Sequence, residues 1–301
     1  MISSLKASDQ QFLNQLNHIS KRMTDAQRQI STGVRLASVA DDPDQVSTLL
    51  NARANLSAAA QIQANLGRVK GEVDAGEQAL QSAVQLFERV RTLGAQGVSG
   101  TQNASTRAAL AQEIGSVMEQ MVALTGTQVE GRYIFSGDSD HTAPYVLDWT
   151  QATPLTTYQG TASTRAVQHP NGTTFQVART AQEIFDSATP SQNVFAKVMA
   201  LRDAFLANDE AAGRTALDAL TTAGDHLNSQ LAFYGTAQNK VQAADNFGQN
   251  LQLQLKTQIS DLADADLTAA ILELNQGQTQ QQAALSSKAQ LPRQTLFDYL
   301  R

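Results

Sequence analysis

The chain contains no cysteine, few aromatic residues and no excess of positive charge. Without cysteine, disulfide scaffolds, thiolate metal sites and cysteine nucleophiles are all excluded. An aromatic share of 5%, beside abundant Gln, Ala and Leu, favours long helices over a compact catalytic domain. The net charge of −6 argues against nucleic-acid binding, because no basic track could neutralise a line of phosphates.

Long apolar runs are also missing. No stretch reaches the roughly 18 apolar residues that a transmembrane helix needs, so we expect no membrane insertion. The N-terminal segment MISSLKASDQQFLNQL has no basic region followed by an apolar core and a small-residue cleavage site. We therefore expect no cleaved secretory signal. Export remains open, because some export routes use uncleaved termini.

No group of residues has the spacing of a catalytic or metal site. The four histidines, His18, His141, His169 and His226, are scattered and form no metal-binding pair. The acidic run at 138–141 lacks the glycine and the distal glutamate of a calcium loop, so we interpret it as a solvated turn. We expect no catalytic residue, no metal and no cofactor, and hence no enzyme.

Both ends of the chain carry helical seams. Leu5, Phe12, Leu16, Ile19, Met23, Ala26 and Ile30 follow a heptad spacing, which is typical of a coiled coil. Near the other end, Leu267, Ile271, Leu274 and Leu285 lie on one stripe with Gln278, Gln281 and Lys288. Residues 1–35 have five basic against two acidic side chains, whereas residues 261–301 have three against five. We predict that the two ends pair and that the apolar seam residues form an assembly interface; the alternative is two ordinary amphipathic helices in one core.

Between these seams the pattern predicts helices, a β-rich insert, and helices again. Gly33 is placed to end the first helix, and Asp42 followed by Pro43 to begin a long second one. After a turn at 94–103, Ser105 is expected to cap a third helix, and helix resumes at 192–208 and after Asp209. The insert has strand candidates at 133–135, 145–149 and 155–158, and an Asn-Gly hairpin between 166–169 and 173–177.

The predicted fold class is therefore mainly α, with long antiparallel helices, a terminal coiled coil and a small β-rich inserted domain. We divide the chain into a terminal assembly domain at 1–44 and 258–301, a helical rod domain at 45–137 and 188–257, and an outward insert at 138–187. The C-terminus adds Leu296, Phe297, Tyr299 and Leu300, which are too large and too near the end for a local core to cover. We predict that these four side chains bind a partner.

Four segments together resemble the bacterial flagellin superfamily: GVRLASVADDPD at 33–44, GRYIFSG at 131–137, LNQGQTQQQAAL at 274–285 and LFDYL at 296–300. The last three are similar to its hook-associated members. The resemblance covers most of 1–137 and 192–301, whereas the insert matches only in position and β character. Arg301 is an extra residue relative to the family ending, and Pro292 stands where the family often has a kink.

The resemblance implies a structural subunit that joins hook and filament, located outside the cell in the flagellum. It implies a homo-oligomeric ring in contact with the first hook-associated protein and with flagellin. It also implies export through the flagellar type III apparatus, with a chaperone holding the C-terminus beforehand. Two alternatives stay open: a short flagellin that forms the filament itself, and an enzyme or ligand-binding module in the insert.

Overall fold

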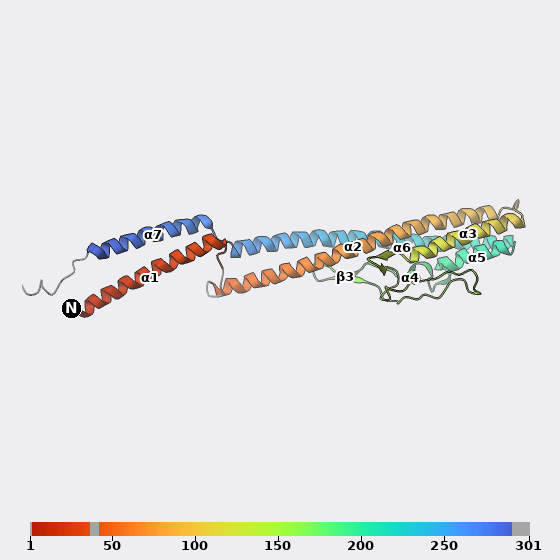
Figure 1. Ribbon diagram of the computed structural model, residues 1–301. Helices are drawn as coiled ribbons and strands as arrows, with labels where there is room; N and C mark the ends of the chain where they lie inside the picture. The colour runs from red at the N-terminus through yellow and green to blue at the C-terminus, as the bar shows by residue number, and fades with distance from the viewer. Residues whose placement is uncertain (1, 37–41, 291–301) are drawn as a thin grey trace, which may run out of the picture. The chain divides into compact units, whose positions relative to one another are not determined.

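Long helices dominate the chain in the computed structural model, which describes residues 2–36 and 42–290, with side chains from residue 9 onward (Figure 1). The α-helices are α1 (Ile2–Thr32), α2 (Pro43–Gly97), α3 (Ala104–Thr125), α4 (Ala181–Phe185), α5 (Val194–Leu206), α6 (Glu210–Ala263) and α7 (Leu267–Gln290), with a 3₁₀ turn at Pro190–Gln192. The strands form two antiparallel hairpins, β1 (Gln128–Val129) with β2 (Arg132–Tyr133), and β3 (Ala166–Gln168) with β4 (Thr174–Gln176). The predicted fold class, mainly α with a small β component, is confirmed.

Most helix boundaries follow the signals in the sequence. Gly33 ends α1 with a φ of +70°, a conformation that glycine adopts without strain. Asp42 Oδ1 accepts a hydrogen bond from the Gln45 amide at the start of α2, 3.2 Å away. The prediction for α3 was wrong by two residues: Asn103 is the cap, accepting from the Thr106 amide at 2.9 Å, and Ser105 lies inside the helix. Asn and Ser are equally good caps, so the residue type did not decide between them.

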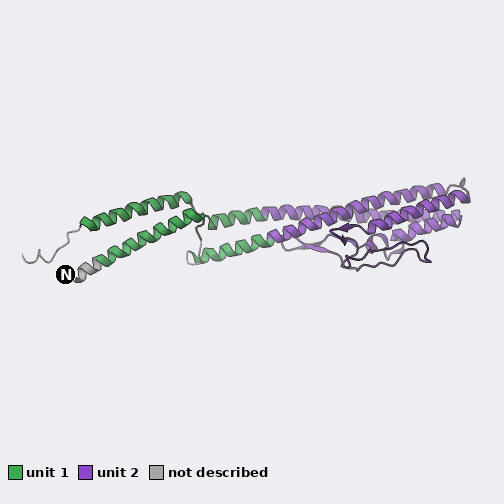
Figure 2. Ribbon diagram, in the orientation of Figure 1, with its two compact units in different colours: residues 1–58, 251–301 green, residues 59–250 purple. Residues whose placement is uncertain are grey.

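The chain forms two compact units, residues 1–58 with 251–301 and residues 59–250, coloured separately in Figure 2. Residues 59–250 enclose a continuous apolar core. Its largest fully buried side chains are aromatic or long aliphatic, and they come from the helices and from the insert alike: Phe87, Met118, Phe135, Phe185, Phe195, Phe205 and Tyr234. A side chain at Gly76 would overlap the Tyr234 ring, so this glycine lets α2 and α6 approach closely.

The insert contains less strand than the sequence predicts. The Asn-Gly hairpin is confirmed, with Ala166 opposite Gln176 and Gly172 at a φ of +92°. The strands predicted at 145–149 and 155–158 do not form and leave one bridge, between Leu147 and Leu155. Trp149 donates its indole N–H to Glu119 of α3 at 2.7 Å, so a side chain attaches this segment to the helices as well. The expected strand at 133–135 is reduced to β2.

The α4 helix has a signal that sequence analysis missed. Thr180 and Glu183 form a reciprocal capping box, the Thr-x-x-Glu pattern that marks a helix start. This short helix places Ile184 and Phe185 in the core of residues 59–250. The insert is thereby attached to the helices by buried side chains.

Candidate assembly surface

The helices α1 and α7 pair, as predicted, and they run antiparallel (Figure 1). Six α7 residues that are buried or half-buried recur at steps of four and three: Ala270, Leu274, Gly277, Gln281, Ala284 and Lys288. We call this set the paired stripe. A Cβ at Gly277 would overlap Met23 Cγ, so the absence of a side chain there allows the two helices to touch.

Polar groups fix the register of this pair. Arg22 of α1 lies 3.3 Å from Glu273 and donates to Gln280 Oε1 at 2.6 Å. Lys288 pairs with Asp9, and its ammonium group also lies 5.4 Å from the centre of the Phe12 ring. These charged side chains are 38–58% exposed, so each ion pair contributes only about 0–1 kcal/mol. They select the alignment more than they add stability.

A second stripe of α7 remains uncovered. Leu267, Ile271 and Leu285 are 47%, 50% and 51% exposed, and together we call them the outer stripe. An α-helix turns by about 100° per residue, so these three residues lie roughly 60–100° around the helix axis from the centre of the paired stripe. They therefore form the helical face next to it. In α1, Leu13 is 54% exposed. Apolar side chains repeated along one helical face and left open to water are typical of an interaction surface.

The predicted interface residues thus fall into three groups. Phe12, Leu16, Ile19, Met23 and Ile30 of α1 are half-buried in the pair, and so is Leu274 of α7. Leu267, Ile271 and Leu285 form the outer stripe. The side chain of Leu5, the residue Pro292, and the cluster Leu296, Phe297, Tyr299 and Leu300 lie outside the described residues. Sequence analysis missed Ala270, Gly277 and Ala284, since small residues give no apolar signal.

Backbone hydrogen bonds join the segment that follows α1 to the segment between α6 and α7. Arg35 donates its amide to the Ala263 carbonyl at 2.7 Å, and Ala265 donates to the Gly33 carbonyl at 2.9 Å. The Arg35 guanidinium also reaches the Leu262 carbonyl at 2.9 Å. Next to these hydrogen bonds, a small apolar cluster is buried; it consists of Leu36, Leu49 and Ala263. The α1–α2 turn is therefore fastened to the α6–α7 turn, far away in sequence.

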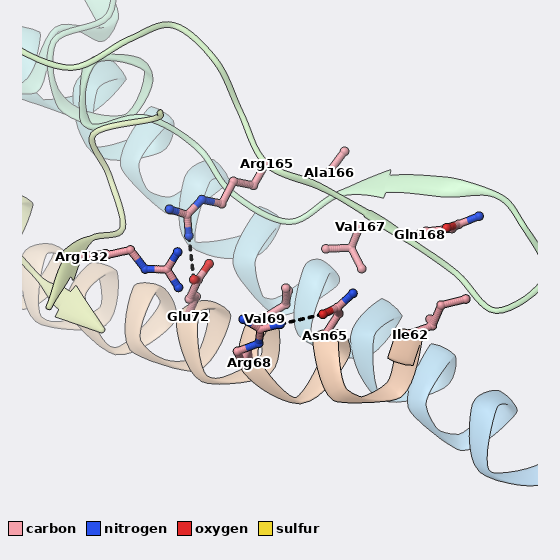
Figure 3. A pocket seen from close by; sticks show the side chains of 10 residues that line it. All are labelled: Ile62, Asn65, Arg68, Val69, Glu72, Arg132, Arg165, Ala166, Val167 and Gln168. Carbon is pink, nitrogen blue, oxygen red and sulfur yellow. Dashed lines mark hydrogen bonds and ion pairs between the residues drawn. The ribbon is translucent and has the colours of Figure 1, made fainter. Parts of the chain in front are cut away.

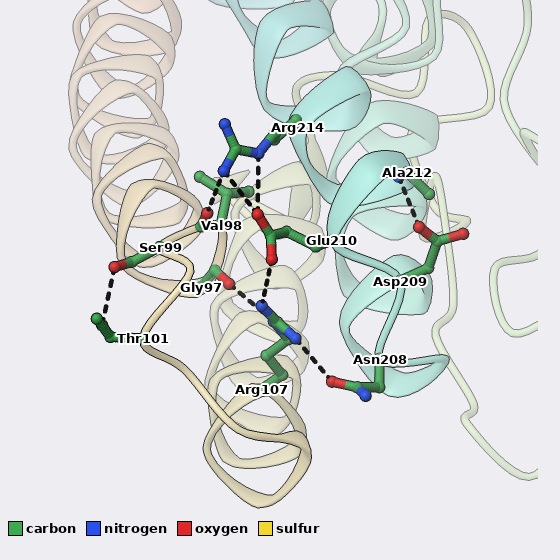
Figure 4. A network of polar contacts seen from close by, with 10 residues as sticks. All are labelled: Gly97, Val98, Ser99, Thr101, Arg107, Asn208, Asp209, Glu210, Ala212 and Arg214. Carbon is green, nitrogen blue, oxygen red and sulfur yellow. Dashed lines mark hydrogen bonds and ion pairs between the residues drawn. The ribbon is translucent and has the colours of Figure 1, made fainter.

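At one end of residues 59–250, a buried arginine links two helix connections by three hydrogen bonds (Figure 4). Arg107 of α3 donates to the Gly97 carbonyl at 3.0 Å, to Asn208 Oδ1 at 2.8 Å and to Glu210 Oε2 at 3.1 Å. Its side chain is only 7% exposed. Glu210 also accepts from Arg214 at 2.6 Å, and these hydrogen bonds and the two positive charges hold the pKa of Glu210 below its usual value. This network secures the α2–α3 and α5–α6 turns.

Within the described ranges, no group of three or more His, Cys, Asp or Glu side chains is arranged to hold a metal ion. No helix among the residues that the structure describes is long and apolar enough to cross a membrane. The prominent surface is therefore the terminal helix pair with its outer stripe.

Comparison with known proteins matches both ends of the chain to one family. The N-terminal helical region of bacterial flagellin matches residues 2–140, and its C-terminal helical region matches residues 217–300. The chain therefore belongs to the bacterial flagellin family and is a structural protein of the bacterial flagellum.

Several relatives resemble it over nearly their whole length. The flagellar hook-associated protein 3 of Escherichia coli (strain K12) is 28% identical over 89% of this chain and 90% of its own. That of Salmonella typhimurium is 26% identical over 91% of both. A solved hook-associated protein of Vibrio parahaemolyticus shares the fold, with a TM-score of 0.64 over 74% of this chain, all of its own, and 24% identity.

Proposed function

We propose that this protein forms the junction between hook and filament by self-assembly. The observation that carries the proposal is the extent of the similarity. Two hook-associated proteins 3 align over about nine-tenths of both chains, whereas a flagellin A of Rhizobium meliloti aligns over 42% of this chain. A subunit of the filament itself would be expected to resemble flagellins at least as broadly.

Assembly would proceed through the terminal domain, residues 1–44 and 258–301. The outer stripe supports this, because Leu267, Ile271 and Leu285 are about half exposed in the described chain and would gain burial against a neighbouring copy. Copies arranged in a ring would cover these stripes, with the first hook-associated protein on one side and flagellin on the other. In this proposal, residues 45–137 and 188–257 form a helical rod domain, and residues 138–187 form an insert that projects outward from the assembly.

The apolar cluster near the C-terminus would also need a partner before assembly. We propose that a chaperone binds Leu296, Phe297, Tyr299 and Leu300 and that export uses the flagellar type III apparatus without a cleaved signal. The cluster supports this, because it places four large apolar side chains within five consecutive residues, a composition typical of a partner-binding segment.

The decisive experiment counts and locates the protein in sheared flagella. Immunogold labelling should mark one site per flagellum, at the hook end, and quantitative mass spectrometry should find far fewer copies than of the filament subunit. Labelling along the filament, at a ratio near one, would replace the junction with the alternative of a short flagellin.

A further inference from the structure

Residues 59–250 contain a cavity of about 350 Å³ between α2 and the strand β3 (Figure 3). Successive turns of α2, from Ile62 to Glu72, form the floor of the cavity. Val167 and its neighbours in β3 form one wall, and Arg132 and Arg165 close the end. The cavity is open along one side, so a small molecule could not be enclosed as it is in most ligand pockets.

Three guanidinium groups line this cavity, and two of them have carboxylate partners. Arg165 lies 2.6 Å from Glu72 and 3.3 Å from Asp140, and Arg132 lies 3.8 Å from Asp140. These contacts connect the insert to α2 and leave Glu72 largely covered.

Arg68 is different. It is exposed, and its hydrogen bond goes to the neutral Asn65 Oδ1 at 2.7 Å. Among the side chains that the structure describes, no carboxylate forms an ion pair with it. Arg68 thus offers a planar set of donors at the mouth of the cavity, and a carboxylate is the group that fits this geometry best.

The strand beside Arg68 also has open hydrogen-bonding groups. His169 donates to Thr173 O, and Val177 donates to Arg165 O, which places the ladder bonds at residues 165, 167 and 169. The amides and carbonyls of Ala166 and Gln168 therefore point away from β4. The cavity offers both a cationic anchor and an unpaired strand edge, two features that suit a carboxylate carried on a peptide.

We propose that this cavity binds an aspartate or glutamate side chain of a second copy of this chain, with the carboxylate on Arg68. The proposal rests on the self-assembly proposed above. A lone exposed ion pair is weak, so a free carboxylate would not be retained. A carboxylate held by an assembled neighbour is present at high effective concentration. The chain carries 28 acidic against 22 basic side chains, so its copies present surplus carboxylates.

A zero-length cross-link tests this contact directly. Arg68→Lys retains the charge and supplies an amine, which a carbodiimide joins to any carboxylate in direct contact. Flagella isolated from cells making Arg68→Lys should give a cross-linked dimer, and mass spectrometry should find the introduced amine at position 68 joined to Asp or Glu of a second copy. The matched control is Arg53→Lys, an exposed position of the same helix. Linkage of native Lys70 to Asp74, which lie 3.0 Å apart, verifies the coupling.

The opposite results are equally clear. If the introduced amine stays unlinked in assembled flagella while the link between Lys70 and Asp74 forms, the proposal is wrong. A link from position 68 to a different protein also overturns it. These outcomes are independent of where the protein sits, because localisation at the junction is read separately by immunogold labelling. If the protein is not found at the junction but position 68 is linked to a second copy, the proposed junction function is wrong and the proposed contact of Arg68 is retained.

A second variant pair separates a protein-borne carboxylate from a free anion. Arg68→Glu should lower incorporation into flagella by about fivefold, because like charges would face each other, and Arg53→Glu should lower it less. Purified wild-type monomer should show no saturable rise in melting temperature with inorganic phosphate or acetate. A saturable rise that Arg68→Gln abolishes would mean that the site takes a free anion, against the proposal.

Discussion

Replacing the outer stripe of α7 should impair assembly and leave the monomer intact. The variant carries Leu267→Gln, Ile271→Gln and Leu285→Gln, since glutamine is a good helix former. About half of each side chain is exposed in the described chain, at 47%, 50% and 51%. Fully burying one such side chain contributes about 1.5–3 kcal/mol, so the exposed half contributes about 1 kcal/mol on assembly. Three positions give about 3 kcal/mol, or roughly a hundredfold in subunit affinity.

Two measurements check this prediction together. The circular dichroism of the purified monomer should match wild type, and its melting should change far less than its assembly, because about half of each outer-stripe residue is already exposed to water in the described chain. The number of copies retained on isolated flagella should fall steeply. The matched control replaces three exposed polar residues of α7, as Thr268→Ala, Gln276→Ala and Gln282→Ala, and should assemble normally. A triple glutamine variant that assembles like wild type would show that these leucine and isoleucine side chains remain in water.

Three further predictions follow from the other contacts. Arg107→Ala removes a buried cation and its three hydrogen bonds, so it should destabilise residues 59–250 by about 3 kcal/mol. Calorimetry should then show a Tm lower by about 6–12 °C, whereas Arg214→Ala, at an exposed side chain, should have little effect. Because the pKa of Glu210 is lowered from 4.5, its contribution to stability is present above pH 4.5 and is lost as the pH falls through its folded value. Acid unfolding of Glu210→Gln should accordingly show a shallower pH slope than wild type, and an equal slope would contradict the assignment. Phe297→Ala with Leu300→Ala should weaken chaperone binding at least about tenfold in calorimetric titration while the melting of residues 59–250 stays unchanged.

The terminal pair shows how much of the surface could be predicted. The α1 seam was identifiable because Phe12, Leu16 and Ile19 are bulky and regularly spaced. The pairing of the two ends was predicted. In α7 the predicted stripe shares Leu274, Gln281 and Lys288 with the paired stripe, whereas its other members, Leu267, Ile271, Gln278 and Leu285, are exposed. Gly277 sets the contact because Met23 fills the space that it leaves, and this complementarity exists only once both helices are present.

Other features depend on contacts across the chain. The Asn-Gly hairpin was predictable because two adjacent residues determine the turn. The segment at 145–149 alternates like a strand, yet Trp149 finds its partner in Glu119. Arg107 had no signal at all, since its acceptors at Asn208 and Glu210 lie about a hundred residues later. Local rules cannot specify partners at that separation.

The pairing of α1 with α7 also sets the order in which the chain can fold. Arg22 and Gln280 are separated by 258 positions, and Asp9 and Lys288 by 279. Whichever end leaves a ribosome or a narrow channel first, its helix has no partner until almost the whole polypeptide has followed. Closing so long a loop is slow compared with forming local helix contacts. We therefore expect the terminal pair to form after the local helix contacts, and a chain cut short before α7 would lack it.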